Sequence, residues 1–278
     1  MQPVRTVKTL DDIPGKCCHP RMTRAAELVS NAIFAAGFFG MGIPTYIVLG
    51  IVALVALFIL VFVTACLGER QYLTGDVEPV SAPYPYPPSC YWEITRENAA
   101  KIGLEHAGDF ATKQNTTMVK GLQSMFISRD RQVIVAIVSG STAGAKLKKT
   151  VLRTKMVNGR ILESTDNPGM KDLSGVVDHA MLYNAGIAEL VDFHTQRIQR
   201  TGMTPVAFKP NSVLQEYERM DLDRGARWVL QGLARWVDPQ QTSIRMTVRG
   251  TFAHLKNLFQ SFGKLGEQQH RAHIRRAG

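Results

Sequence analysis

The feature that most constrains this chain is an unbroken apolar run, TYIVLGIVALVALFILVFVTACL, which extends from Thr45 to Leu67 without a charged residue. A helix of this length, at about 1.5 Å per residue, covers the hydrocarbon core of a bilayer, which is about 30 Å thick. A helix in a soluble core would show polar residues at every third or fourth position. The run is also too long and begins too late for a cleaved signal peptide. The sequence therefore predicts a transmembrane helix over residues 44–67 in an integral membrane protein.

The residues before this run leave the topology open. Residues 1–27 are predicted to be a flexible arm, and residues 28–43 are a weaker apolar segment interrupted by Ser30 and Asn31. Small residues every fourth position let helices approach closely in lipid, so residues 28–43 fit a second span in a helical hairpin. An interfacial helix leading to a single span is the other interpretation. The flanking cations nearly balance, so the sequence does not fix the side of the membrane on which the following domain lies.

Cysteine usage indicates neither a disulfide framework nor a metal site. The four cysteines are Cys17, Cys18, Cys66 and Cys90, which leaves the long region after residue 90 without a thiol. Cys17 and Cys18 have no second Cys or His pair at the spacing that a zinc site needs. We therefore predict no metal and no cofactor.

The segment after the apolar run, residues 68–90, is rich in proline. Its second half, EPVSAPYPYPPSC, contains five of the thirteen prolines of the chain. Such a composition favours an extended polyproline II spacer of about 3 Å per residue. We therefore predict a stalk that holds the next domain away from the lipid.

Residues 91–262 are long enough for one domain with its own core. Residues 118–128 and 132–139 have strand patterns, and the sequence VIVAIV in the second is apolar on both faces, which predicts a central strand. Segments 149–157 and 160–165 are joined by Asn158-Gly159, which predicts a hairpin with a two-residue turn. Successive strands favour a meander over alternating βαβ units. The predicted fold class is therefore α+β, an antiparallel β-meander with flanking helices that is tethered to the transmembrane helix.

Helix signals flank these strands. Thr95 fits an N-cap before a helical pattern, Ser212 fits a capping box, and His194 lies on a mostly buried helical face. We expect helices over residues 96–107, 184–200, 212–220, 226–237 and 251–262, a further strand over 243–248, and a basic tail over 263–278.

Positive charge is the more specific functional signal. The formal net charge is +10, and no acidic residue lies between Asp130 and Glu163. Basic clusters attract polyanions, and each lysine near an anionic bilayer contributes about 1 kcal/mol. The sequence argues against nucleic acid as the ligand, because the basic segment lacks interleaved aromatic residues for base stacking. The predicted anion-binding residues are Lys146, Lys148, Lys149, Arg153, Lys155, Arg275 and Arg276.

Candidate acid–base residues are present, but none stands in a known catalytic spacing. Imidazole and carboxylate groups exchange protons near neutral pH, which selects His106, Asp178, His179 and His194 as weak catalytic candidates. The motifs of serine hydrolases, zinc proteases and dinucleotide-binding enzymes do not occur.

We therefore expect a membrane-anchored, non-catalytic interaction module. Its basic surface would contact anionic lipid headgroups or an acidic partner protein. A membrane-anchored hydrolase that uses the histidines and carboxylates above is the alternative.

Overall fold

The computed structural model describes residues 45–113, 119–142, 145–167 and 172–257. The predicted arm, the weaker apolar segment 28–43 and the basic tail with Arg275 and Arg276 lie outside these residues. The chain divides into two units between residues 58 and 59, inside the first described helix. That helix and the domain that follows it are therefore treated separately.

Helix α2 (Thr45–Gly68) agrees with the predicted apolar helix to within a residue at each end. Most of its large side chains between residues 51 and 61 are exposed, with Leu54 at 68% and Leu60 at 60%. The hydroxyl of Thr64 donates to the backbone oxygen of Leu60 at 2.9 Å, so this polar group is satisfied inside the helix. Among the described residues, α2 is the one helix long and apolar enough to cross a membrane.

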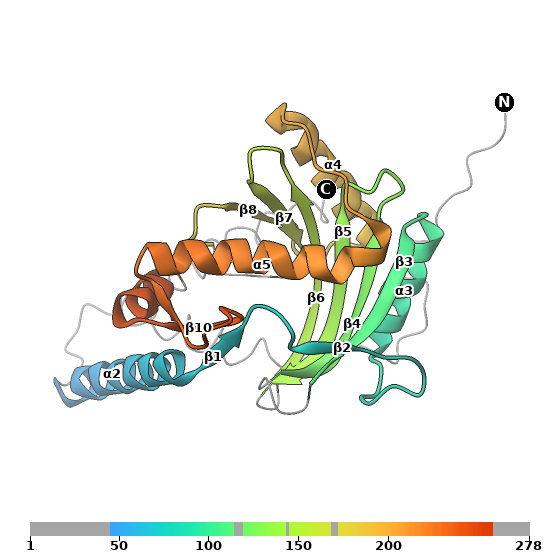
Figure 1. Cartoon of the computed structure of the whole chain (residues 1–278). Helices are drawn as coiled ribbons and strands as arrows, with labels where there is room; N and C mark the ends of the chain where they lie inside the picture. Colours follow the sequence, from blue (N-terminus) through green and yellow to red (C-terminus); the bar gives the residue numbers. More distant parts are fainter. Residues whose placement is uncertain (1–44, 114–118, 143–144, 168–171, 258–278) are drawn as a thin grey trace, which may run out of the picture. The chain divides into compact units, whose positions relative to one another are not determined.

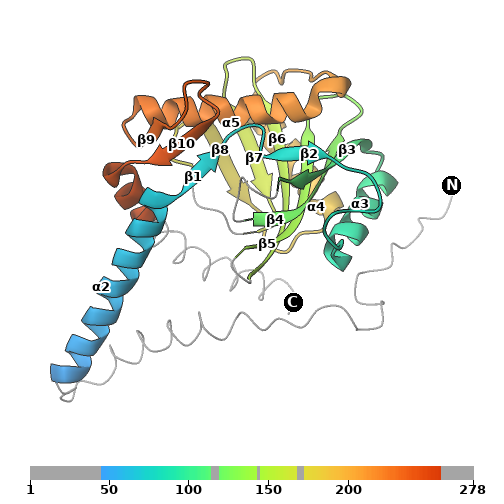
Figure 2. The same cartoon turned by 60° about the horizontal axis from the view of Figure 1, so that its bottom comes forward.

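The domain after α2 contains two sheets and, among its described residues, three complete α-helices and a further helical segment over residues 248–257 (Figures 1 and 2). The larger sheet has seven strands in the order β2 (Val77–Pro79), β3 (Glu105–Thr112), β4 (Val119–Ile127), β5 (Ile134–Thr142), β6 (Ala145–Lys155), β7 (Ile161–Thr165) and β8 (Val177–Met181). The smaller sheet has the order β1 (Arg70–Tyr72), β10 (Ser243–Met246) and β9 (Ala234–Trp236). The helices are α3 (Cys90–Lys101), α4 (Ile187–Thr201) and α5 (Val213–Leu230), the last preceded by the short 3-10 turn η2 (Pro210–Ser212).

The predicted α+β class and the antiparallel meander are confirmed. Strands β2 to β7 follow one another in the sheet in chain order, and each pairs antiparallel with the next. The last pairing differs, because β8 runs parallel to β7. No strand is predicted between residues 165 and 184, so β8 is a correction. Its five residues are all half-buried and lack the alternation that marks a strand in a sequence.

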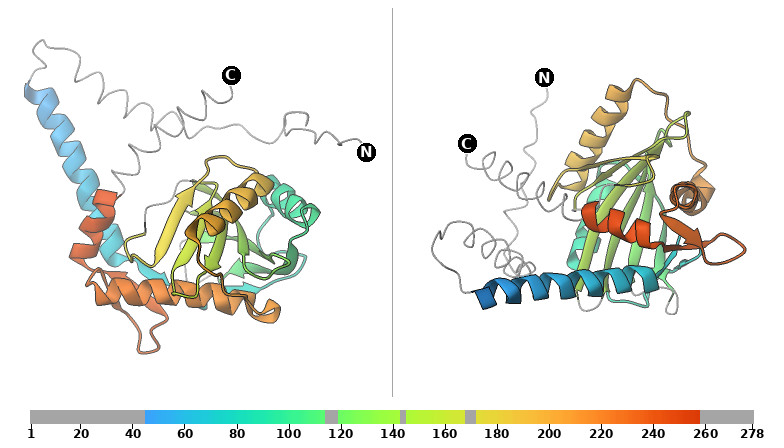
Figure 3. Two further views of the ribbon diagram at one scale, coloured as in Figure 1. Left: turned by 90° about the horizontal axis from the view of Figure 1, so that it is seen from above. Right: turned by 90° about the vertical axis from the view of Figure 1, so that its left-hand side faces the viewer.

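Helices cover both faces of the large sheet (Figure 3). One face, called here the α3–α4 face, packs Leu122, Phe126 and Leu152 against Trp92 of α3 and Leu190 of α4. The opposite face, called here the α5 face, carries a second cluster to which α5 contributes. That cluster includes Met125, Ile127, Ile134, Ile161, Val213 and Met220.

The prediction for the central strand is confirmed, since β5 is the middle strand of seven. Val135 and Ile137 pack in the core of the α3–α4 face, and Ile134 packs in the core of the α5 face. All three are fully buried. An apolar run without alternation is what a strand covered on both faces requires.

The hairpin of β6 and β7 is confirmed, but its turn is longer than expected. Lys155 pairs with Ile161, so five residues connect the strands. The amide of Gly159 donates to the backbone oxygen of Met156 at 2.9 Å, and Gly159 is the residue with positive φ in the turn. The Asn-Gly pair therefore supplies one left-handed residue rather than the two that a type I′ turn uses.

The first helix of the domain begins earlier than its predicted position. Ser89, not Thr95, caps α3, and its hydroxyl accepts from the amide of Trp92 at 3.2 Å. The helix ends at Lys101, and residues 105–107, expected to be helical, belong to β3. Both cap residues are chemically suitable, but the cap at Ser89 lets Trp92 and Ala99 reach the core.

The Pro-rich segment is part of the domain and not a spacer. Residues 77–79 form β2, which pairs with β3. The Tyr84 hydroxyl donates to Asp109 at 2.9 Å, and the Tyr86 hydroxyl donates to the backbone oxygen of Thr112 at 3.2 Å. Both rings pack against the core of the α3–α4 face. The domain consequently begins at Arg70, two residues after α2 ends, and not near residue 91.

Two predictions for the C-terminal half are confirmed and two are corrected. Helix α4 and strand β10 lie where expected. Helix α5 is continuous from Val213 to Leu230, and the hydroxyl of Ser212 bonds to Lys209 instead of forming a capping box. Residues 234–236, expected in a second helix, form β9. The last described residues, 248–257, are helical and begin three residues before the predicted start.

Candidate functional site

Strand β6 divides the predicted anion-binding residues between the two faces of the sheet. Successive side chains of a strand point to opposite faces. Lys146 and Lys148 therefore share a face with Thr150, whose hydroxyl lies 2.6 Å from that of Tyr91 on α3. Lys149, Arg153 and Lys155 point to the α5 face. The five cations consequently do not form one surface.

On the α5 face, Arg153 is an internal residue. It is 6% exposed, its Nε donates to Glu163 Oε2 on β7 at 2.8 Å, and its Nη1 lies 3.0 Å from Asp221 Oδ2 on α5. The guanidinium also lies 4.1 Å from the ring centroid of Tyr217. Lys155 pairs with Asp223 at 2.9 Å. Arg153 and Lys155 therefore hold α5 on the sheet and are already engaged within the domain.

The carboxylate of Glu163 is the negative centre of this buried cluster. His179 Nδ1 lies 2.9 Å from Glu163 Oε1, opposite the contact with Arg153. Burial alone would raise the pKa of Glu163, but Arg153, the hydrogen bond with His179 and the charge of Lys149 outweigh it and hold the pKa well below its usual range. Burial lowers the pKa of the Lys149 ammonium. The positive charges of Arg153 and Lys149 thus compensate the carboxylate of Glu163 and keep it ionised.

On the α3–α4 face, three lysines lie together at one end of the sheet. Ser141 of β5 pairs with Lys120 on one side and with Lys146 on the other, so these two lysines are about 10 Å apart on the same face. Lys148 lies two residues further along β6 on that face, with its Nζ 5.8 Å from the ring centroid of Tyr91. Lys120 and Lys146 are exposed, and Lys148 is half-buried. Within the described ranges none of the three forms an ion pair, and we call this set the lysine face.

The catalytic candidates are not brought together. Asp178 and His179 are neighbours on β8 and point to opposite faces. Asp178 pairs with Arg197 of α4 at 3.0 Å, whereas His179 lies in the Glu163 cluster. His194 is fully buried on α4, as expected of a satisfied core histidine.

Both ring nitrogens of His194 contact hydroxyl groups inside the core. Its Nε2 lies 3.0 Å from the Thr154 hydroxyl and its Nδ1 lies 2.8 Å from the Ser164 hydroxyl. Arg197 donates to the same Ser164 hydroxyl at 2.8 Å, which connects His194 indirectly to Asp178. This chain of contacts is closed to substrate, since His194, Thr154 and Ser164 are all fully buried.

His106, the fourth candidate, belongs to a separate cluster around Asp109 on β3. The Asp109 carboxylate lies 2.8 Å from His106 Nε2 and 2.9 Å from Arg96 Nη2, and it accepts from Ser124 at 2.5 Å. Burial would raise the pKa of Asp109, but the hydrogen bonds from Ser124, His106 and Tyr84 outweigh it and lower the pKa.

A groove of about 420 Å³ runs beside this cluster and is lined by Trp92, Arg96 and His106, among others. Arg96 stacks on the Trp92 ring at 5.0 Å while it pairs with Asp109. The guanidinium that Arg96 presents to the groove is therefore already paired with Asp109. Of the four catalytic candidates, His106 lines this groove.

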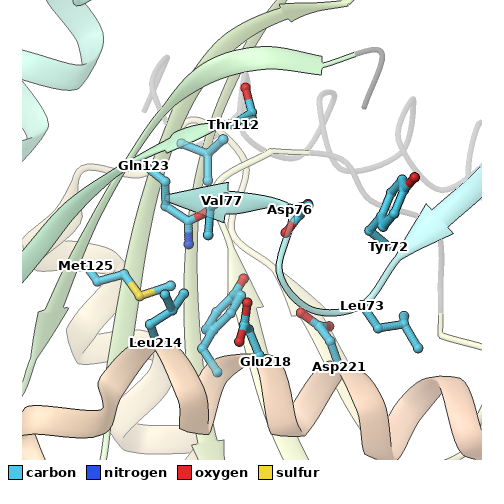
Figure 4. A pocket seen from close by; sticks show the side chains of 12 residues that line it. Tyr72, Leu73, Asp76, Val77, Thr112, Gln123, Met125, Leu214, Glu218 and Asp221 are labelled. Carbon is cyan, nitrogen blue, oxygen red and sulfur yellow. The ribbon is translucent and has the colours of Figure 1, made fainter. Parts of the chain in front are cut away.

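The second cavity, of about 250 Å³, lies on the α5 face (Figure 4). Asp76, on the link between β1 and β2, and Glu218 and Asp221, on α5, point toward one another in it. Gln123, Met125 and Val138 of the sheet and Leu214 of α5 contribute further walls. We call it the acidic cavity.

Several of these residues were missed from the sequence. The alternation along β6 could have separated Lys146 and Lys148 from the other cations, since the strand itself was predicted. Lys120 carried a weaker signal, because its strand register relative to Lys146 depends on the pairing of both strands with β5. The partners Glu163 and Asp221 lie on different elements and had no local signal at all.

Comparisons with protein-family models, with curated proteins and with solved structures found no match to this chain.

Proposed function

We propose that this chain is a membrane-anchored, non-catalytic interaction module whose lysine face contacts anionic lipid headgroups. The observation that carries the proposal is the placement of Lys120, Lys146 and Lys148 on one face of the sheet without acidic partners among the described residues. This set retains two of the predicted anion-binding residues and adds Lys120.

The anchoring part of the proposal rests on α2. Its 24 residues contain no charge, and most of its large apolar side chains between residues 51 and 61 are exposed, as expected of a helix in contact with lipid. The domain begins at Arg70, so the linker is too short to hold it far from the headgroups. The nearest polyanion for an anchored domain is therefore the bilayer surface itself.

The free energy with which the lysine face binds an anionic bilayer follows from its three lysines. Each lysine near an anionic surface contributes about 1 kcal/mol, so the lysine face contributes about 3 kcal/mol at low ionic strength. Arg153 and Lys155 add nothing to this surface, since their side chains pair with carboxylates of the domain. Because His106, His179 and His194 lie in three separate groups of contacts, no hydrolase is proposed.

Alkaline carbonate extraction tests the anchor. The full chain should stay in the membrane pellet, and Leu57→Arg should release it, because an arginine at the centre of a span costs about 3 kcal/mol or more. Release of the unmodified chain into the supernatant would contradict the anchor.

Amine modification followed by mass spectrometry tests the lysine face in the full chain reconstituted into vesicles. Lys120, Lys146 and Lys148 should react more slowly in vesicles with anionic lipid than in neutral vesicles. The protection should disappear at about 0.5 M salt, where the Debye length is about 4 Å. Exposed lysines elsewhere on the domain are the internal controls, namely Lys101, Lys209 and Lys256.

Two results would count against the proposal. Equal reactivity of the lysine face in anionic and neutral vesicles would exclude lipid contact. Protection that appears only in native membranes would instead identify an acidic protein as the partner.

A further inference from the structure

The acidic cavity has a charge opposite to that of the whole chain. The chain carries a net charge of +10, yet the carboxylates of Asp76, Glu218 and Asp221 are the only charged side chains among the described residues that line this cavity. A cavity lined by these carboxylates favours a cationic ligand. The lysine face of the same domain favours anions.

Two of the three carboxylates form no ion pair with a described residue. Asp221 is compensated by Arg153 at 3.0 Å and by Arg224 at 2.8 Å. Asp76 and Glu218 form no ion pair with any residue in the described part of the chain. Glu218 accepts a hydrogen bond from the amide of Gly75 at 2.8 Å, which supplies a dipole but not a charge.

The surroundings of Asp76 show that a cation would be accepted there. Burial raises the pKa of Asp76, and the charges of Glu218 and Asp221 raise it further. The charge of Lys113 lowers that pKa, and the Lys113 ammonium also donates to the backbone oxygen of Gly75 at 2.7 Å. Bringing a cation between Asp76 and Glu218 would relieve the repulsion between these carboxylates.

The remaining walls are suited to a small organic group. Val77, Met125, Val138 and Leu214 provide apolar surface. Tyr217 also lines the cavity, and its hydroxyl makes no hydrogen bond with a described residue, which makes it a further polar group available to a ligand. At about 250 Å³ the cavity is just below the size of typical drug-sized sites, about 300 Å³ and above, so the ligand must be small.

A metal ion fits this cavity less well than an organic cation. Among the residues that the structure describes, no three His, Cys, Asp or Glu side chains approach closely enough to hold a metal. The carboxylates surround a space with an apolar wall, and hard metal ions require oxygen ligands on most sides.

We propose that the acidic cavity binds a primary alkylammonium ion. The ammonium donates charge-assisted hydrogen bonds to Asp76 and Glu218. The alkyl part lies against Met125, Val138 and Leu214. This inference is independent of the lysine face, since the two sites lie on opposite faces of the sheet.

The ammonium group could come from a soluble amine or from an amine-bearing lipid headgroup. The first cavity residue in the chain, Tyr72, follows the last residue of α2 by four positions, at most about 14 Å of extended chain. A headgroup is therefore within reach if α2 spans the bilayer, and the experiment must separate the two sources.

Titration calorimetry on the full chain in phosphatidylcholine nanodiscs tests the site, with n-butylammonium as the probe and n-butanol as its neutral isostere. We expect n-butylammonium to bind and n-butanol to bind at least about tenfold more weakly. Asp76→Asn and Glu218→Gln should each weaken n-butylammonium binding about tenfold. Glu216→Gln, on the same helix but outside the cavity, should leave binding unchanged. Thermal unfolding of each variant establishes that it is folded.

Equal affinity for n-butylammonium and n-butanol would overturn the proposal, as would unchanged affinity in both Asp76→Asn and Glu218→Gln. Repeating the titration in phosphatidylethanolamine nanodiscs identifies the source. Weaker apparent binding there means that the primary-amine headgroup competes for the site and is the ligand. Unchanged binding means that the ligand is a soluble amine.

Discussion

Arg153 of β6 and Asp221 of α5 face each other across the interface between sheet and helix, with Nη1 and Oδ2 3.0 Å apart. Arg153 simultaneously donates to Glu163 on β7. One buried cation thus joins α5 to the sheet and compensates two carboxylates that come from distant parts of the chain. Replacing Arg153 should show how much of the domain's stability depends on these contacts.

Arg153→Met should lower the free energy of unfolding by about 3–5 kcal/mol, because it leaves Glu163 and Asp221 with reduced compensation in a buried site. Urea unfolding of the full chain in detergent measures the loss. Lys155→Met is the matched control, since its partner Asp223 is 44% exposed and such a pair contributes about 1 kcal/mol or less. A loss in Arg153→Met no larger than in the control would contradict the assigned role.

His194 should make the domain less stable in acid. Burial lowers its pKa from 6.5 to about 3, and the charge of Arg197 adds to this effect. Between these two values the unfolded chain binds a proton that the folded chain does not. The free energy of unfolding therefore falls with falling pH in this window, by up to about 1.4 kcal/mol per pH unit.

His194→Gln should remove this contribution and give a shallower decline of stability between about pH 6.5 and pH 4. The measurement is the free energy of unfolding at a series of pH values. Thr195→Ala, at an exposed neighbouring position, should keep the slope of the unmodified chain. Identical slopes for His194→Gln and the unmodified chain would show that another group controls the acid limit.

Gly121 should not tolerate a side chain. It pairs directly with Gly140, and a Cβ at Gly121 would lie 2.3 Å from the backbone oxygen of Ser139. Gly121→Ala must push β4 and β5 apart, at a cost of about 3 kcal/mol in thermal or urea unfolding. Gly186→Ala has open space around the new atom and should change stability by less than about 1 kcal/mol. Similar losses for the two variants would refute the steric argument.

The start of the domain can be tested by truncation. A chain beginning at Tyr91 lacks β1, β2 and the Ser89 cap, so we expect it to lose cooperative unfolding. A chain beginning at Glu69 retains them and should unfold cooperatively. Near-ultraviolet circular dichroism during thermal unfolding distinguishes the two. A cooperative transition in the shorter chain would restore the view that residues 78–90 are only a spacer.

The parts of the fold that the sequence predicts are those determined by local pattern. Helix α2, the central strand and the β6–β7 hairpin each depend on a continuous run or a turn within a few residues. The three-residue strands β1, β2 and β9 are too short to show a period. Ser89 and Thr95 are equally good caps in isolation, and core packing decides between them.

The sites were less predictable because they depend on distant pairings. The cluster of basic residues is apparent in the sequence. Assigning these residues to the two faces of the sheet depends on the direction in which the side chains of β6 point. The acidic cavity combines the link after β1 with α5, and Asp76 and Glu218 are 142 positions apart. Such a separation leaves no trace in a single sequence without an aligned family.

The smaller sheet also bears on the order in which the chain is made. Strand β1 directly follows α2, and its partner β10 is at residues 243–246, so that Arg70 and Ser243 are 173 positions apart. During synthesis β1 leaves the ribosome long before its partner exists. The unpaired edge must therefore remain open until β10 has been synthesised, which makes this part of the domain the natural place for a chaperone to act on the nascent protein.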